Sequence, residues 1–119
     1  DELFLISGPC VIEDESIMMK VAEDLKEITE RLNIPFVYKS SFQKDNRSSV
    51  DYYMGPGLDE GLRILEKVKK EFNLDFDLLF CDETTLKTIV RSNPGILTLD
   101  KGTITGKWSW RQLENISLD

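Results

Sequence analysis

Positive charge and hydrogen-bonding groups are concentrated in residues 39–57, whose sequence is KSSFQKDNRSSVDYYMGPG. Lys39, Lys44 and Arg47 supply the charge, while Asn46 and the serines around it supply amide and hydroxyl groups. Such a set suits a small anion, because charge-assisted hydrogen bonds hold phosphate and carboxylate groups well. The alternative is a solvated surface loop, since polar loops usually lie at the surface.

The charge balance of the whole chain makes this cationic stretch unusual. The 119 residues include 15 Lys and Arg against 22 Asp and Glu, which gives a net charge of −7. A net negative chain repels nucleic acid and anionic membranes, so we expect neither as a partner. No apolar run approaches the ~20 residues that span a bilayer. No basic and apolar leader opens the sequence, so we expect a cytoplasmic protein.

The elements that must position the cationic stretch are two strands and the helix between them. Residues 3–7 and 35–39 are short apolar runs, which predict strands buried on both faces. The intervening helix is predicted from apolar residues at steps of three and four, and either Asp14 or Ser16 could cap it. Those apolar residues are Ile17, Val21, Leu25, Ile28 and Leu32.

A second helix is predicted to begin at Asp59, after the Gly-Pro-Gly of residues 55–57. Its apolar stripe comprises Leu62, Leu65, Val68 and Phe72. Buried strands that alternate with crossover helices are typical of parallel βαβ units. In such α/β folds, ligands bind at the carboxyl ends of the strands, and residues 39–57 begin at one of those ends.

The pattern changes after residue 74. Residues 76–81 predict a third strand, and Asp82 is a suitable cap for the short helix that follows. Residues 96–99 and 103–108 predict an antiparallel hairpin, because Gly102 can take the positive φ of a tight turn. The predicted fold class is therefore α/β, with a parallel opening and an antiparallel end.

Several motifs together resemble the N-terminal part of the 3-deoxy-manno-octulosonate-8-phosphate synthase family (2-dehydro-3-deoxyphosphooctonate aldolases). They are ISGPCVIE, then FVYKSSFQKDNRSS, then Gly-Pro-Gly-Leu before the next helix. The resemblance covers residues 3–73. It implies the opening βαβα units of a (β/α)8 barrel and a cytoplasmic transferase of lipopolysaccharide biosynthesis that condenses phosphoenolpyruvate with arabinose 5-phosphate. It also implies a homotetramer.

The same resemblance gives roles to residues of the cationic stretch. It implies that Lys39 and Lys44 contact phosphoenolpyruvate, and that Asn46, Arg47 and Ser48 hold the pentose phosphate. The planar guanidinium of Arg47 suits a phosphate, since it can donate two parallel hydrogen bonds.

Cys10 follows the first predicted strand and resembles the cysteine of the metal-dependent branch of the family. There it would join a histidine, a glutamate and an aspartate around a divalent ion, which could polarise the aldehyde as a Lewis acid. The alternative is a small buried apolar residue. The chain has no histidine, so the catalytic set is incomplete. We therefore assign no catalytic base and expect no turnover by this chain alone.

Residues 74–119 are similar to the C-terminal part of a thioredoxin-like domain, as in the soluble tails of DoxX-type proteins. This resemblance predicts a β-α-β-β segment, and with residues 1–73 it indicates a chimera joined near 73/74. It leaves open a compact thioredoxin-like α/β sandwich that binds or only packs. The redox cysteine pair of that fold is missing, so we predict no disulfide exchange.

Overall fold

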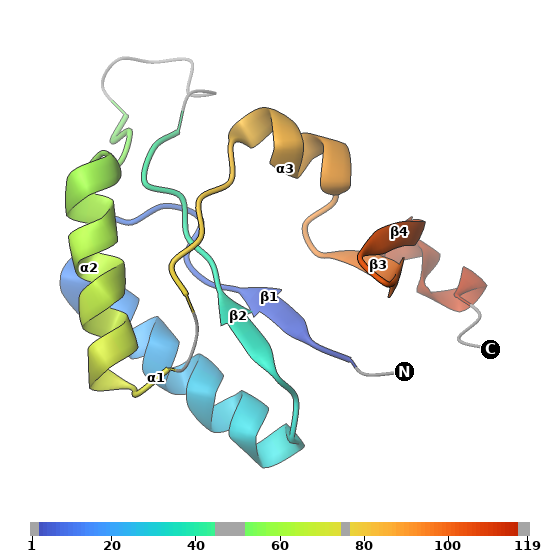
Figure 1. Cartoon of the computed structure of the whole chain (residues 1–119), viewed down its shortest axis with the longest axis horizontal. Helices are drawn as coiled ribbons and strands as arrows, with labels where there is room; N and C mark the ends of the chain where they lie inside the picture. The colour runs from blue at the N-terminus through green and yellow to red at the C-terminus, as the bar shows by residue number, and fades with distance from the viewer. Residues whose placement is uncertain (1–2, 45–51, 75–76, 117–119) are drawn as a thin grey trace. The chain divides into compact units, whose positions relative to one another are not determined.

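The computed structural model describes residues 3–44, 52–74 and 77–116. These residues belong to two compact units, which comprise residues 1–78 and 79–119 (Figure 1). The boundary predicted near 73/74 stays a prediction. Within the described ranges, no helix has the length and apolar character needed to cross a bilayer.

The first unit contains two parallel strands and two helices. Its elements are β1 (Leu5–Ser7), α1 (Glu15–Leu32), β2 (Phe36–Tyr38) and α2 (Leu58–Glu71). Leu5 pairs with Phe36 and Ser7 with Tyr38 in parallel register, which confirms the predicted βαβ unit.

The core of the first unit lies where α1 and α2 pack together beside Tyr38. It comprises Ile12, Met18, Ala22, Tyr38, Ile64 and Val68. Only one face of the strand pair contributes, because Tyr38 is buried while Val37 beside it is 44% exposed and neighbouring residues of a strand point to opposite faces. The prediction that both strands are buried on both faces is therefore wrong. No described element of the unit covers the second face.

Asp14, one of the two predicted caps, is the residue that caps helix α1. The Asp14 side chain accepts from the Ser16 backbone N–H at the amino end, and Asn33 closes the helix with a φ of 54°. The predicted apolar stripe is only partly correct: Val21 and Leu25 pack partly buried against the core, but the fully buried row lies one residue further along. Met18, Ala22 and Thr29 are buried, whereas Ile17, Ile28 and Leu32 are 49%, 41% and 57% exposed. The two rows differ by one residue, which is about 100° around a helix.

Helix α2 shows a similar shift. Its buried residues are Gly61, Ile64 and Val68, while the predicted core residue Leu62 is 37% exposed. Val68 was predicted correctly, and Leu65 and Phe72 pack partly buried against the core.

The second unit consists of a short helix, a hairpin and a final helical turn. These are α3 (Glu83–Ile89), β3 (Gly95–Asp100), β4 (Thr103–Ser109) and the 3₁₀ helix η1 (Trp110–Asn115). The Asp82 side chain caps α3 by accepting from the Thr85 backbone N–H at 2.9 Å. The hairpin is confirmed, with φ of 48° at Lys101 and 82° at Gly102, as a type I′ turn requires.

The prediction of a third strand is wrong for residues 77–81, the part of it that the structure describes. Residues 77–81 form no strand, and Leu79 and Phe80 are 89% and 65% exposed. A strand needs a partner for its backbone groups, and in the described ranges β1 pairs only with β2 and β3 only with β4. The α/β class is confirmed. These two small sheets confirm neither a barrel nor a thioredoxin-like sandwich.

Candidate anion-binding site

The carboxyl ends of β1 and β2 lie side by side and carry the predicted site residues. The Lys39 backbone N–H donates to the Ser7 carbonyl at 2.9 Å, which extends the pairing one residue beyond the strands. Lys39 thus follows β2 directly, while Gly8, Pro9 and Cys10 follow β1. The structure confirms that the start of the cationic stretch lies at this edge.

Two lysine side chains converge on one serine at this edge. Lys39 Nζ donates to Ser41 Oγ at 3.4 Å, and Lys44 Nζ donates to the same oxygen at 3.1 Å. All three residues are half-buried, so solvent screens the charges less than at a fully exposed position. Two cations that both contact one hydroxyl raise the positive potential around it, and this arrangement favours an anion beside Ser41.

Hydrogen bonds to the loop after β1 hold the segment that carries these side chains. The Ser40 hydroxyl donates to the Pro9 carbonyl at 2.7 Å. The Ile12 backbone N–H donates to the Ser41 carbonyl at 2.9 Å, and the Ile12 side chain is fully buried in the core. The backbone around Ser41 is therefore tied to the core of the first unit.

Tyr38 holds the carboxyl end of β2 against helix α1. Its hydroxyl donates to the Met18 carbonyl in α1 at 2.8 Å. Burial raises the pKa of the Tyr38 phenol to about 12, so the side chain stays a neutral donor at physiological pH. The residue before Lys39 is thus fixed by both packing and a hydrogen bond.

The other predicted binding residues, Asn46, Arg47 and Ser48, lie outside the described residues. Their predicted contacts with a pentose phosphate stay predictions.

Cys10 is exposed and its thiol is free, so it is not the small buried apolar residue of the alternative interpretation. Among the residues that the structure describes, no three His, Cys, Asp or Glu side chains lie close enough together to hold a metal ion. One thiolate does not form a divalent-metal site. The described residues therefore do not fit the metal centre that the family resemblance implies.

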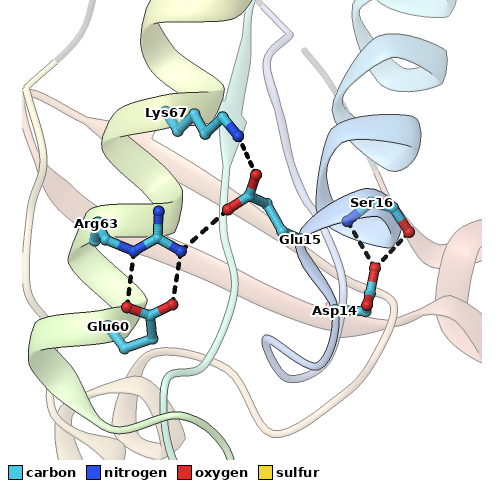
Figure 2. Close-up of polar contacts among 6 residues, drawn as sticks. All are labelled: Asp14, Glu15, Ser16, Glu60, Arg63 and Lys67. Carbon is cyan, nitrogen blue, oxygen red and sulfur yellow. Dashed lines mark hydrogen bonds and ion pairs between the residues drawn. The ribbon is translucent and has the colours of Figure 1, made fainter.

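An ion-pair cluster joins the amino-terminal end of α1 to α2 (Figure 2). The Glu15 carboxylate accepts from Arg63 Nη2 at 3.0 Å and also from Lys67 Nζ. Arg63 in turn donates to both carboxylate oxygens of Glu60, at 2.7 and 2.8 Å. Hydrogen bonds from Lys67 and then Arg63 hold the pKa of Glu15 below its usual value. The cluster ties together the two helices that follow the two loops of the site.

Replacing Glu15 with glutamine should change how stability depends on pH. A carboxyl whose pKa is lower in the folded state stabilises the fold above its unfolded pKa, and this stabilisation is lost as pH falls through the folded pKa. We therefore expect the E15Q variant to have a lower urea midpoint than wild type at neutral pH, with the difference shrinking as the pH falls below the usual pKa of a glutamate and through the lowered pKa of Glu15. Because Glu15 is partly exposed and its partners are exposed to solvent, about 1 M salt should reduce the difference at neutral pH.

The matched control is E66Q, since Glu66 is an exposed residue of α2 and the ion pairs of the cluster join other residues. Equal pH profiles for wild type and E15Q would show that the cluster contributes nothing to stability.

Sequence reasoning missed two features of this region. It noted Ser41 only as one of several hydroxyls, because nothing in the sequence shows that both lysines turn toward it. It also missed the cluster around Glu15. The spacing of Glu60, Arg63 and Lys67 on α2 was the available signal, because residues three and four apart share one helix face.

Comparisons with known proteins agree with the motifs. A family model described as the DAHP synthetase I family matches residues 1–92. Several relatives are named 2-dehydro-3-deoxyphosphooctonate aldolase. The protein from Acidithiobacillus ferrooxidans (strain ATCC 53993 / BNL-5-31) is 62% identical over 68 residues, which are 57% of this chain and 24% of that protein.

Two further relatives carry the same name. The protein from Legionella pneumophila (strain Corby) is 58% identical over 72 residues, which are 60% of this chain and 26% of that protein. The protein from Coxiella burnetii (strain Dugway 5J108-111) is 51% identical over 87 residues, which are 73% of this chain and 31% of that protein. The aligned part of the chain thus spans about a quarter to a third of the length of these relatives.

The family model extends over more than half of the sequence, and its range includes both strands of the first unit and the converging lysines. The chain belongs to the DAHP synthetase I family.

Proposed function

We propose that this chain carries the substrate-binding segment of a transferase like 2-dehydro-3-deoxyphosphooctonate aldolase. The observation that supports this most directly is the convergence of Lys39 and Lys44 on the Ser41 hydroxyl at the carboxyl ends of two parallel strands. The names of the relatives support phosphorylated substrates for the proposed site, because a phosphooctonate is built from phosphorylated precursors.

The proposed reaction joins C3 of phosphoenolpyruvate to the aldehyde carbon of arabinose 5-phosphate. Water adds to C2 of the enol, and inorganic phosphate leaves from the same carbon. The first substrate carries a carboxylate and a phosphate, so it needs cations at more than one point. We assign Lys39 and Lys44 to this substrate, since their ammonium groups both contact one hydroxyl. The Ser41 hydroxyl can accept from a lysine while it donates to the anion.

We assign the second substrate to Asn46, Arg47 and Ser48. The family resemblance supports this assignment, and the bidentate geometry of a guanidinium with a phosphate gives it a physical reason. The assembly implied by the resemblance is a homotetramer.

The proposed role stops at substrate binding for this chain alone. It contains no histidine, and histidine is the residue most often used as a general base. Cys10 would need further ligands from outside the described residues to hold a divalent ion, so we assign no step of the reaction to a metal ion.

Calorimetric titration with arabinose 5-phosphate tests the proposal. We expect wild type to bind and R47A to bind at least about tenfold more weakly, since a hydrogen bond to a charged group contributes about 1.5–3 kcal/mol. K101A is the control, because Lys101 is an exposed residue of the β3–β4 turn and its loss changes the net charge equally. Equal binding by wild type and R47A, or no binding by either, would remove the assignment.

A further inference from the structure

Phe42 is an apolar residue inside the polar segment that carries the converging lysines. It lies between Ser41 and Lys44 in sequence, and its side chain packs partly buried against the core of the first unit. A polar binding loop does not need an aromatic residue at this position for charge or hydrogen bonding. Its packing indicates a role in holding the segment.

The side chain of Phe42 fits only because Gly61 in α2 has no side chain. A Cβ atom added at Gly61 would lie 2.8 Å from Phe42 Cβ and 3.3 Å from Ile12 Cδ1. Gly61 is also buried in the first turn of α2, and glycine in a helix costs conformational entropy relative to alanine. The close packing of Phe42 on the helix therefore explains why residue 61 is a glycine.

The backbone of Phe42 is held from a second direction. A Cβ at Gly55 would lie 2.3 Å from the Phe42 carbonyl oxygen, and the φ of Gly55 is 109°. The Phe42 carbonyl accepts from the Gly57 backbone N–H at 3.1 Å, and the Lys44 backbone N–H donates to the Met54 carbonyl at 2.8 Å. Residues 54 and 57 thus form backbone hydrogen bonds with the segment.

We propose that Phe42, Gly55 and Gly61 form a seat that positions Ser41 and Lys44 for anion binding. These three residues are called the Phe42 seat below. They are positioning residues, since none of them carries a group that would bind the anion. The binding part of this inference rests on the proposed function. The structural part, that the seat holds the segment, does not.

The test uses G61A in the full chain. Alanine is a stronger helix former than glycine, so the substitution favours α2 itself while it pushes Phe42 outward. We expect amide hydrogen exchange at Lys44 and Gly57 to become about tenfold faster. Exchange at Ile34, whose N–H donates to the Thr29 carbonyl far from the seat, should not change. E66A is the control for an alanine on an exposed position of the same helix.

The second readout is calorimetric titration with phosphoenolpyruvate. We expect G61A to bind about tenfold more weakly than wild type at an unchanged melting temperature, a combination that general loss of folding would not produce. In an F42G background the closest contact, with Phe42 Cβ, is gone and the 3.3 Å contact with Ile12 Cδ1 remains, so adding G61A should change the exchange rates and the binding much less than it does in wild type.

The outcomes separate the two proposals. Unchanged exchange at Lys44 and Gly57 in G61A would overturn the seat. Faster exchange with unchanged phosphoenolpyruvate binding would overturn its role in positioning. If wild type does not bind phosphoenolpyruvate, the proposed function fails, and the exchange measurement still decides whether the Phe42 seat holds the segment.

Discussion

Replacement of Met18 by alanine should lower the free energy of unfolding of the first unit by about 2–5 kcal/mol. Met18 is 0% exposed and lies in the core with Ile12 and Tyr38, so the shorter side chain would leave a cavity. The carbonyl that accepts from Tyr38 belongs to the Met18 backbone and remains in the variant. The expected loss therefore reports the packing of the Met18 side chain, including its 3.9 Å contact from Sδ to the Tyr38 hydroxyl, and not the hydrogen bond to the backbone.

The matched control is I17A, one residue earlier on α1. Ile17 is 49% exposed, so we expect it to cost less than about 1 kcal/mol. Urea unfolding followed by helix circular dichroism measures both variants. Both tryptophans, Trp108 and Trp110, lie in the second unit, so tryptophan fluorescence gives an internal reference. A larger cost for I17A than for M18A would contradict the packing described here.

Removal of both converging lysines should have the largest effect on ligand binding. We expect the K39A/K44A double variant to bind phosphoenolpyruvate at least about 100-fold more weakly than wild type. A hydrogen bond to a charged group contributes about 1.5–3 kcal/mol, and the two contributions need not add because both side chains share Ser41. This prediction rests on the proposed function.

A K70A/K101A variant is the matched control, since both positions are exposed and the change in net charge is the same. Calorimetry at low salt and at about 0.5 M salt measures the affinity, because screening should reduce a nonspecific charge effect in both variants. Equal weakening in the two double variants would show that net charge alone draws the ligand, and would contradict a built site at Ser41.

Local signals in the sequence predicted the backbone of this protein well. Asp14 and Asp82 cap the helices that they were expected to cap, and Gly102 takes the positive φ of the hairpin turn. These features depend on the chemistry of one or two residues, so the sequence contains the information they need. The missing strand at residues 77–81 differs, because a strand depends on a partner from elsewhere.

The choice of buried face on α1 could not be predicted from periodicity. Two neighbouring rows of the helix recur at helical spacing, one with Ile17, Val21 and Ile28 and one with Met18, Ala22 and Thr29. Which row is buried depends on where Tyr38 and α2 lie. Tertiary packing thus decides a question that hydrophobic spacing leaves open.

The sequence predicted at which edge of the sheet Lys39 lies, but not how the side chains near it are arranged. The position of Lys39 after a parallel strand indicated the correct edge of the sheet. The meeting of two lysines at Ser41 and the contact between Phe42 and Gly61 both depend on how the chain folds back after β2. No spacing rule for helices or strands applies to that segment.

The exposure of Cys10 and Cys81 has a consequence for how the protein behaves outside a reducing environment. Both thiols are free and reachable by solvent, with one in each compact unit. A molecule with two separate oxidisable ends can join two others, as a bifunctional monomer does in step-growth polymerisation. Air oxidation would therefore yield a ladder of covalent oligomers on a non-reducing gel, whereas a chain with either cysteine replaced by serine would stop at the dimer.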